Sequence, residues 1–344
     1  LQCPRTTILI TSIQFEQIFV INAPWRTDRK DAMSLIASYH DISFKWINGV
    51  NSTQITDSAF PPGKHQEIPP GARGCWRAHM NALQHVVAQN LSTALIFEDD
   101  VDWDIRLRSQ LLNLSRASRN LPKLITHANK KPHTSPTIPQ KQTQDPIDLA
   151  HRSSMPISQL TSTSISNEAP YGVDWDVLWL GHCGATLPPP SPMSPDRIVQ
   201  LNDETVPSPS HLRRRRNAAQ DEFASLYPPY TRVYHRTANS TLCLHAYAVT
   251  RRGARKLLYQ FGIRGLGQGY DFALSDYCGG GARGEREGEG ERPMCLTVQP
   301  PLYSQFWSER GESDIMATGR EGRMSGSRYI RRSVRMGLEG LVGG

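Results

Sequence analysis

The residues of this chain best suited to chemistry are five carboxylates that follow a short apolar run. The run is residues 94–97 (ALIF), and the acids after it are Glu98, Asp99, Asp100, Asp102 and Asp104. A short continuous apolar run predicts a buried strand, and open α/β sheets bind ligands at the carboxyl ends of their strands. Adjacent carboxylates repel one another unless a cation joins them. The cluster therefore predicts magnesium or manganese; a solvated acidic loop is the alternative.

A second candidate position is the turn after the predicted strand 18–22. Thr27 is expected to cap a helix over residues 28–39, which places Arg26, Arg29 and Lys30 near a helix N-terminus. Such a position can hold phosphate. The alternative is that these charged side chains only face solvent.

An amphipathic helix is predicted over residues 74–89. Its inward stripe has helical spacing and consists of Cys75, His79, Leu83, Val86 and Val87. The pattern leaves two roles open for His79, a hydrogen-bonded core residue or a residue that lines a binding site.

The remaining elements are placed by their apolar patterns. Further strands are expected at residues 43–47, 175–181 and 242–250 and in a last strand ended by Pro300 and Pro301. Helices are expected over 105–118 and over 251–262, the latter closed by Gly262. A glycine-rich loop then precedes a short acidic helix with Asp271 and Asp276. Residues 8–10 could add a short strand, and the basic segment 325–338 a helix.

Three stretches lack the pattern of a folded core. The chain has 344 residues, 38% of them hydrophobic, with 25 Pro and 26 Gly. Residues 122–170, 187–230 and 279–292 are dense in polar residues, Pro or Gly, and cannot bury enough surface to offset chain entropy. We predict that they are disordered inserts, and that residues 1–17 are a poorly ordered N-terminus.

Charge and cysteine usage restrict the class of protein. The net charge is +7, much of it in residues 213–216 and in the arginine-rich C-terminus, and no nucleic-acid-binding motif accompanies it. The six cysteines include no Cys-x-x-Cys pair, which argues against zinc and leaves the redox compartment open. No apolar run could span a membrane, and a signal or anchor is expected to have preceded Leu1. Asn51, Asn90, Asn113 and Asn239 begin glycosylation triplets.

Taken in order, the ordered blocks resemble glycosyltransferase family 25, which includes lipooligosaccharide and collagen galactosyltransferases. The family's Gly-Cys-x-x-Ser-His helix has Ala78 in place of the serine, and its Asp-Glu acceptor motif is Asp271-Phe272 here. The blocks that carry the resemblance are residues 18–33, 74–87, 94–103, 174–181, 245–258, 269–277 and 298–302.

The resemblance implies an α/β fold of the GT-A type, a Rossmann-like sandwich with one mixed sheet, in a glycosyltransferase domain over residues 18–344. It implies inverting transfer of a hexose, usually galactose, from a UDP-sugar to a hydroxyl of a glycan or protein, and a secretory-lumen location. Asp99 and Asp100 would hold Mn²⁺ or Mg²⁺, with Glu98 beside them, while Arg26, Arg29 and His79 would contact the nucleotide. Asp271 would be the general base, and Asp276 is the alternative residue for this role.

Two other classes stay open. A catalytically degraded carbohydrate-binding protein would bind glycan without metal. A nucleotidyltransferase could also use an acidic strand end with two metals, and would release pyrophosphate from a nucleoside triphosphate.

Overall fold

The computed structural model describes residues 13–130, 147, 150–151, 153–160, 169–189, 195–209, 223, 226–237, 240–280, 292–308 and 326–343. The predicted strand at 8–10 and residues 281–291 of the predicted insert 279–292 lie outside this set.

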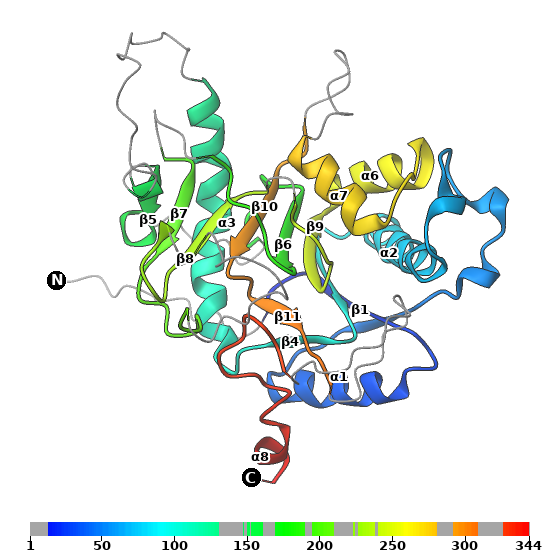
Figure 1. Ribbon diagram of the computed structural model, residues 1–344, viewed down its shortest axis with the longest axis horizontal. Helices are drawn as coiled ribbons and strands as arrows, with labels where there is room; N and C mark the ends of the chain where they lie inside the picture. The colour runs from blue at the N-terminus through cyan, green and yellow to red at the C-terminus, as the bar shows by residue number, and fades with distance from the viewer. Residues whose placement is uncertain are drawn as a thin grey trace.

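One mixed sheet of eleven strands organises the described residues (Figure 1). Its main path is β2-β1-β3-β9-β6-β10-β8-β7-β5, and β11 pairs with both β4 and β6. β1 is parallel to β2 and β3, whereas β9 is antiparallel to β3 and β6. The strands are β1 (Gln17–Asn22), β2 (Lys45–Asn48), β3 (Thr93–Glu98), β4 (Val101–Trp103), β5 (Ser154–Pro156), β6 (Val177–Gly181), β7 (Arg197–Gln200), β8 (Arg232–Arg236), β9 (Ala246–Thr250), β10 (Cys295–Gln299) and β11 (Tyr303–Gln305).

Helices cover both faces of this sheet. The helices are α1 (Thr27–Tyr39), α2 (Pro70–Ala88), α3 (Leu107–Lys130), α6 (Arg251–Tyr259), α7 (Tyr270–Gly279) and α8 (Leu338–Val342). Short turns are η1 (Ser52–Gln54), η2 (Asp57–Ala59), η3 (His65–Glu67), η4 (Ile157–Gln159) and the π-helical η5 (Gln260–Arg264). α1 and α3 pack in one hydrophobic cluster, and α2, α6 and α7, which lie together in Figure 1, pack in another.

The alternation of side chains along β3 explains its continuous apolar sequence. Leu95 and Phe97 belong to the cluster of α1 and α3, while Ala94 and Ile96 belong to that of α2, α6 and α7. A strand covered on both sides needs apolar residues at every position. The predicted Rossmann-like α/β sandwich with one mixed sheet is confirmed.

The predicted disorder of residues 122–170 is wrong where the structure describes this stretch. α3 continues through Pro122 to Lys130, because Leu121 and Ile125 are buried in the core. Residues 154–159 form β5 and η4, and β5 pairs with β7. β7 itself lies inside the second predicted insert, 187–230, and is buried at Ile198. Sequence composition missed these pieces because each is short and buries its apolar residues against distant segments.

Three smaller expectations also need correction. Thr27 is the first residue of α1 rather than its cap; the cap position is Arg26, which makes no side-chain capping bond. Gly262 does not close α6, because η5 carries the helical path on and buries Phe261. The described part of the basic C-terminus, residues 326–337, is not helical, and α8 begins only at Leu338.

No helix among the described residues has the length and apolar character that crossing a bilayer requires.

Candidate functional site

The ends of four central strands bring the candidate residues to one edge of the sheet. β1 and β3 are parallel, so Asn22 and Glu98 end neighbouring strands at this edge. β9 starts there, and the backbone N–H of Glu98 donates to the carbonyl oxygen of His245 at 3.0 Å. β6 ends there too, with Gly181 opposite Ala246. The predicted position of the acids at a carboxyl edge is therefore confirmed.

Arg29 lies between the two aspartates predicted as metal ligands. Its Nη1 is 2.9 Å from Asp99 Oδ1 and 3.0 Å from Asp100 Oδ2. Asn22 donates to Asp99 Oδ2 at 2.8 Å, and Gln305 donates to Asp100 Oδ2 at 3.0 Å. Both oxygens of Asp99 are thus engaged, whereas Asp100 Oδ1 is buried without a hydrogen-bond partner. The fold leaves one carboxylate oxygen available to a ligand.

Burial and Arg29 act on the pKa of both aspartates, but the net shift is upward for Asp99 and downward for Asp100. Burial, followed by the charge of Asp100, raises the pKa of Asp99 above its ordinary value despite Arg29. Burial alone would raise the pKa of Asp100 as well, but Arg29 and then His245 outweigh it, and the net pKa is lowered. Asp100 therefore stays ionised with one oxygen unbonded.

Glu98 and His79 lie beside this pair. His79 Nε2 is 3.5 Å from Glu98 Oε1, and His79 Nδ1 is 3.1 Å from the hydroxyl of Tyr247. Burial, and then the charge of Asp100, raises the pKa of Glu98 to about 8. Burial lowers the pKa of His79 to about 3. Both side chains are consequently neutral near pH 7, and His79 is a buried residue that also lines the site.

Asp271 faces this cluster, whereas Asp276 does not take part in it. Asp271 lies in the first turn of α7, accepts a hydrogen bond from the backbone N–H of Cys243 at 3.2 Å, and contributes to raising the pKa of Glu98. The cap position of α7 is Gly269, so Asp271 is not a helix cap. Asp276 is exposed and accepts from Gln268 at 2.7 Å.

Arg26 has a different environment from Arg29. Its Nη2 is 2.7 Å from Asp28 Oδ2, and it lowers the pKa of that exposed carboxyl. The predicted pair of nucleotide-binding arginines is therefore divided, with Arg29 directed at the carboxylates and Arg26 bonded to Asp28.

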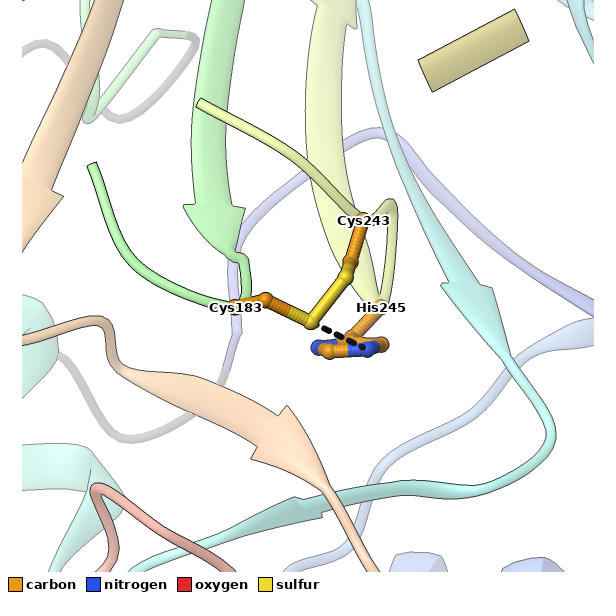
Figure 2. A group of neighbouring side chains, drawn as sticks. All are labelled: Cys183, Cys243 and His245. Atoms are coloured by element: carbon orange, nitrogen blue, oxygen red, sulfur yellow. Dashed lines mark hydrogen bonds between the residues drawn. A yellow bond between two sulfur atoms is a disulfide. The ribbon is translucent and has the colours of Figure 1, made fainter. Parts of the chain in front are cut away.

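A disulfide that sequence reasoning missed borders the site. Figure 2 shows Cys183, after β6, bonded to Cys243, before β9, with the ring of His245 beside them. His245 Nε2 is 3.9 Å from Cys183 Sγ. Since the two sulfurs are bonded to each other, these three residues are not a metal site. The pairing depends on β6 lying next to β9, and no spacing in the sequence encodes that neighbourhood.

A second disulfide, Cys278 to Cys295, joins the end of α7 to the start of β10. The first disulfide ties the segment before β9, whose N–H of Cys243 binds Asp271, to the end of β6. The second ties α7, which carries Asp271, to β10. Cys75 is a free cysteine among the described residues.

Two residues from the C-terminal part also reach the site and were missed. Gln305 is the partner of Asp100 named above. Arg335 is buried and donates to the carbonyl oxygens of Asp99 and Val101, both at 2.7 Å. It comes from the basic segment 325–338, which was expected to be a helix and whose residues 326–337 are not helical, so no sequence signal indicated its position.

Comparison with known proteins supports the resemblance carried by these residues. Residues 15–147 match the family model described as Glycosyltransferase family 25 (LPS biosynthesis protein). The predicted resemblance to this family is confirmed. The matched range contains Arg29, His79 and the acids from Glu98 to Asp104, but it ends before Asp271.

Curated relatives agree with the family match. The human Inactive glycosyltransferase 25 family member 3 is 28% identical over 116 residues, covering 30% of this chain and 20% of the relative. Procollagen galactosyltransferase 1-A of Xenopus laevis is 25% identical over 114 residues, covering 30% and 19%. Procollagen galactosyltransferase 2 of Mus musculus is 25% identical over 112 residues, covering 29% and 18%. The similarity thus spans about a fifth of each relative's length, and these relatives include one named inactive.

Proposed function

We propose that this protein is a glycosyltransferase that transfers a hexose, galactose first among the candidates, from a UDP-sugar to a hydroxyl of a glycan or protein. The single observation that carries the proposal is the buried, unbonded oxygen of the ionised Asp100 at the carboxyl edge of the sheet. The matches to glycosyltransferase family 25 and to procollagen galactosyltransferases support the reaction class and the sugar.

The donor set at this edge suits a hard cation through one protein carboxylate. Asp100 Oδ1 is available, whereas Asp99 would first have to give up Arg29 or Asn22. Magnesium and manganese commonly take one or two carboxylates and complete their coordination with substrate phosphates. When bound, the cation supplies positive charge to the departing diphosphate.

The chain's own residues would supply the remaining steps of an inverting transfer. Arg29, placed between Asp99 and Asp100, adds a second positive charge at the edge where the diphosphate would lie. Asp271 would accept the proton of the attacking hydroxyl, since its carboxylate faces the cluster from α7. The disulfide between Cys183 and Cys243 holds the N–H that orients this carboxylate.

The test measures UDP release by the full chain from UDP-galactose and other UDP-sugars. Release should need Mn²⁺ or Mg²⁺, stop with a chelator, and be lost in Asp100→Asn, whose amide can still accept from Gln305 but cannot replace the charge. Release that persists with the chelator and in Asp100→Asn would contradict the proposal. Pyrophosphate release from a nucleoside triphosphate would instead support a nucleotidyltransferase.

A second candidate is a catalytically degraded carbohydrate-binding protein. Both oxygens of Asp99 are already bonded within the protein, and a similar human protein is named inactive. This candidate predicts metal-independent glycan binding without UDP release in the same assay.

We further propose that the protein works in an oxidising compartment such as the secretory lumen. Two disulfides among the described residues support this, because disulfides persist mainly in such compartments. The triplet residues Asn51 and Asn90 are exposed, so glycosylation there is sterically open.

A further inference from the structure

Three metal-ligating side chains from α2 and β3 meet beside the carboxylate cluster. Cys75 Sγ, a ring nitrogen of His79 and a carboxylate oxygen of Glu98 all lie within 4.8 Å of one another. Cys75 and His79 are four residues apart, so they occupy the same face of α2 one turn apart. Glu98 ends β3, against which this face of α2 packs. The fold thus brings together a thiol, an imidazole and a carboxyl.

His79 gives independent evidence that this group is incomplete. The side chain is 1% exposed, and its Nε2 has no hydrogen-bond partner although it lies 3.5 Å from Glu98 Oε1. Its other nitrogen, Nδ1, is engaged by the hydroxyl of Tyr247 at 3.1 Å. An unpaired buried polar atom costs about 1–3 kcal/mol. Nε2 of His79, which has no hydrogen-bond partner, therefore faces the position where the side chains of Cys75 and Glu98 meet.

We propose that Cys75, His79 and Glu98 bind a borderline-soft divalent cation of the zinc class, at a site separate from the diphosphate cation at Asp100. Thiolate, imidazole and carboxylate are the three donor types that zinc takes from proteins, so a site of this kind does not need the Cys-x-x-Cys pair whose absence from the sequence argued against zinc. A thiolate and a carboxylate together balance two positive charges, so the loaded site is neutral in its buried surroundings. Three protein ligands leave a fourth position open.

The geometry needs only a small adjustment to accept zinc. Tetrahedral zinc with ordinary bond lengths separates its ligand atoms by about 3.3–3.5 Å. The distance of 3.5 Å between His79 Nε2 and Glu98 Oε1 already fits. The thiol of Cys75 lies within 4.8 Å of the ligand atoms of both side chains, so it has to approach each of them by about 1.3 Å or less. In the tautomer with the proton on Nδ1, His79 donates a hydrogen bond to the hydroxyl of Tyr247, and the lone pair of Nε2 is free for the metal.

This inference stands apart from the proposed transferase activity. A cation here would bridge α2 to the end of β3 whether or not sugar transfer occurs. Cobalt can report the site, because a thiolate ligand gives a thiolate-to-cobalt charge-transfer absorption, whereas cobalt held by the carboxylate of Asp100 and by phosphate oxygens alone does not.

The experiment titrates the metal-free full chain with Co²⁺ and then displaces it with Zn²⁺. One equivalent of Co²⁺ should produce the charge-transfer absorption, and Zn²⁺ should abolish it. Cys75→Ser should remove the absorption, and His79→Gln or Glu98→Gln should weaken cobalt binding on the order of 100-fold, the upper end for loss of a supporting group. His85→Gln, at an exposed position of the same helix, is the matched control and should bind as the unaltered chain does.

If Cys75→Ser fails to fold, a variant of Tyr247, which bonds to His79 without being a ligand, still tests the proposal. Tyr247→Phe removes the partner of His79 Nδ1 but none of the three ligands, and should weaken cobalt binding roughly 10–100-fold. Absence of the charge-transfer absorption in the folded, unaltered chain would overturn the proposal. So would an absorption that persists in Cys75→Ser, or cobalt affinity unchanged in both His79→Gln and Tyr247→Phe.

Discussion

Two groups of acids occupy the same short segment, and the fold treats them in opposite ways. Asp102 and Asp104 are fully buried, and every carboxylate oxygen of both accepts a hydrogen bond. Asp102 accepts from Ser327 and from the backbone N–H of Arg335. Asp104 accepts from Arg106 and from the backbone N–H of Arg332. Burial raises the pKa of Glu98 as it does that of Asp102. Asp100, although buried, keeps one carboxylate oxygen without a hydrogen-bond partner.

The difference shows how to separate structural from functional acids in this protein. Asp102 and Asp104 fasten the C-terminal segment to β4, and nothing about them calls for a ligand. Arg29 and Gln305 hold Asp100 without engaging both of its oxygens, and Glu98 faces the neutral ring of His79 at 3.5 Å. A bound cation would relieve the remaining repulsion between these acids. Residue type and spacing are alike in the two groups, so only the partners distinguish them.

The largest expected effect tests whether Asp271 belongs with the incompletely bonded acids. If it accepts the proton of the acceptor hydroxyl, Asp271→Asn should lower transfer by roughly 10²–10⁴-fold while keeping stability and UDP-sugar binding. Asp276→Asn, an exposed position on the same helix, should transfer normally. Transfer rates of the two variants with a saturating UDP-sugar provide the measurement, and equal rates would remove Asp271 from the mechanism.

The next effect tests what holds the incompletely bonded group in place. Cys183 and Cys243 are 60 residues apart, and Cys278 and Cys295 only 17. Chain-entropy estimates give about 4 kcal/mol for closing the longer loop and about 3 kcal/mol for the shorter. Replacing both cysteines of a pair by serine should lower the free energy of unfolding accordingly, measured in urea without reductant. Transfer should suffer only from loss of the first pair, because that pair fixes the N–H bound to Asp271. Transfer at the unaltered rate after loss of the pair Cys183 and Cys243 would show that this disulfide does not organise the site.

The outcomes of sequence-based prediction follow the same division. The strand at 94–97, the helix carrying Cys75 and His79, and the convergence of the acids at a sheet edge could be predicted, because apolar periodicity and strand direction are local properties. The residues that bond to these acids, and the disulfide beside them, could not be predicted. Gln305, Arg335 and the pairing of Cys183 with Cys243 depend on β11, the C-terminal segment and the order of β6 and β9, which no local pattern encodes. The helical residues 122–130 were missed because Pro122 and the polar composition outweighed the single buried core residue of this stretch, Ile125.

A smaller effect compares the two groups directly in stability. In Asp104 both oxygens receive two hydrogen bonds, so the amide group of Asp104→Asn must face donors and should cost about 1–3 kcal/mol. In Asp100→Asn the amide nitrogen can occupy the Oδ1 position and keep both donors at Oδ2. The pair with Arg29 is weakened, but the repulsion from Glu98 and Asp99 is relieved, so the cost should be smaller than that of Asp104→Asn. Urea unfolding of the metal-free variants measures both. A larger loss from Asp100→Asn would mean that its charge, rather than its bonding, sustains the fold.

The smallest effect concerns Glu98 and the dependence of stability on pH. Burial raises its pKa to about 8 from an ordinary value of 4.5, so between these values the folded protein holds a proton that the unfolded chain has released. Stability from this group is complete below pH 4.5 and falls as the pH rises through 8, by at most about 1.4 kcal/mol per pH unit.

Comparing the unaltered chain with Glu98→Gln between pH 6.5 and 8.5 isolates this group, because the histidines and the thiol of Cys75 are present in both proteins. Glutamine carries no such proton, so Glu98→Gln should lose less stability than the unaltered chain as the pH rises. Urea unfolding must be done with a chelator, because a cation at Cys75 and His79 would favour the ionised carboxylate and hide the slope. Parallel curves for the two proteins across this window would show that Glu98 is ionised at neutral pH in the folded state, and would contradict the assignment of a proton to it.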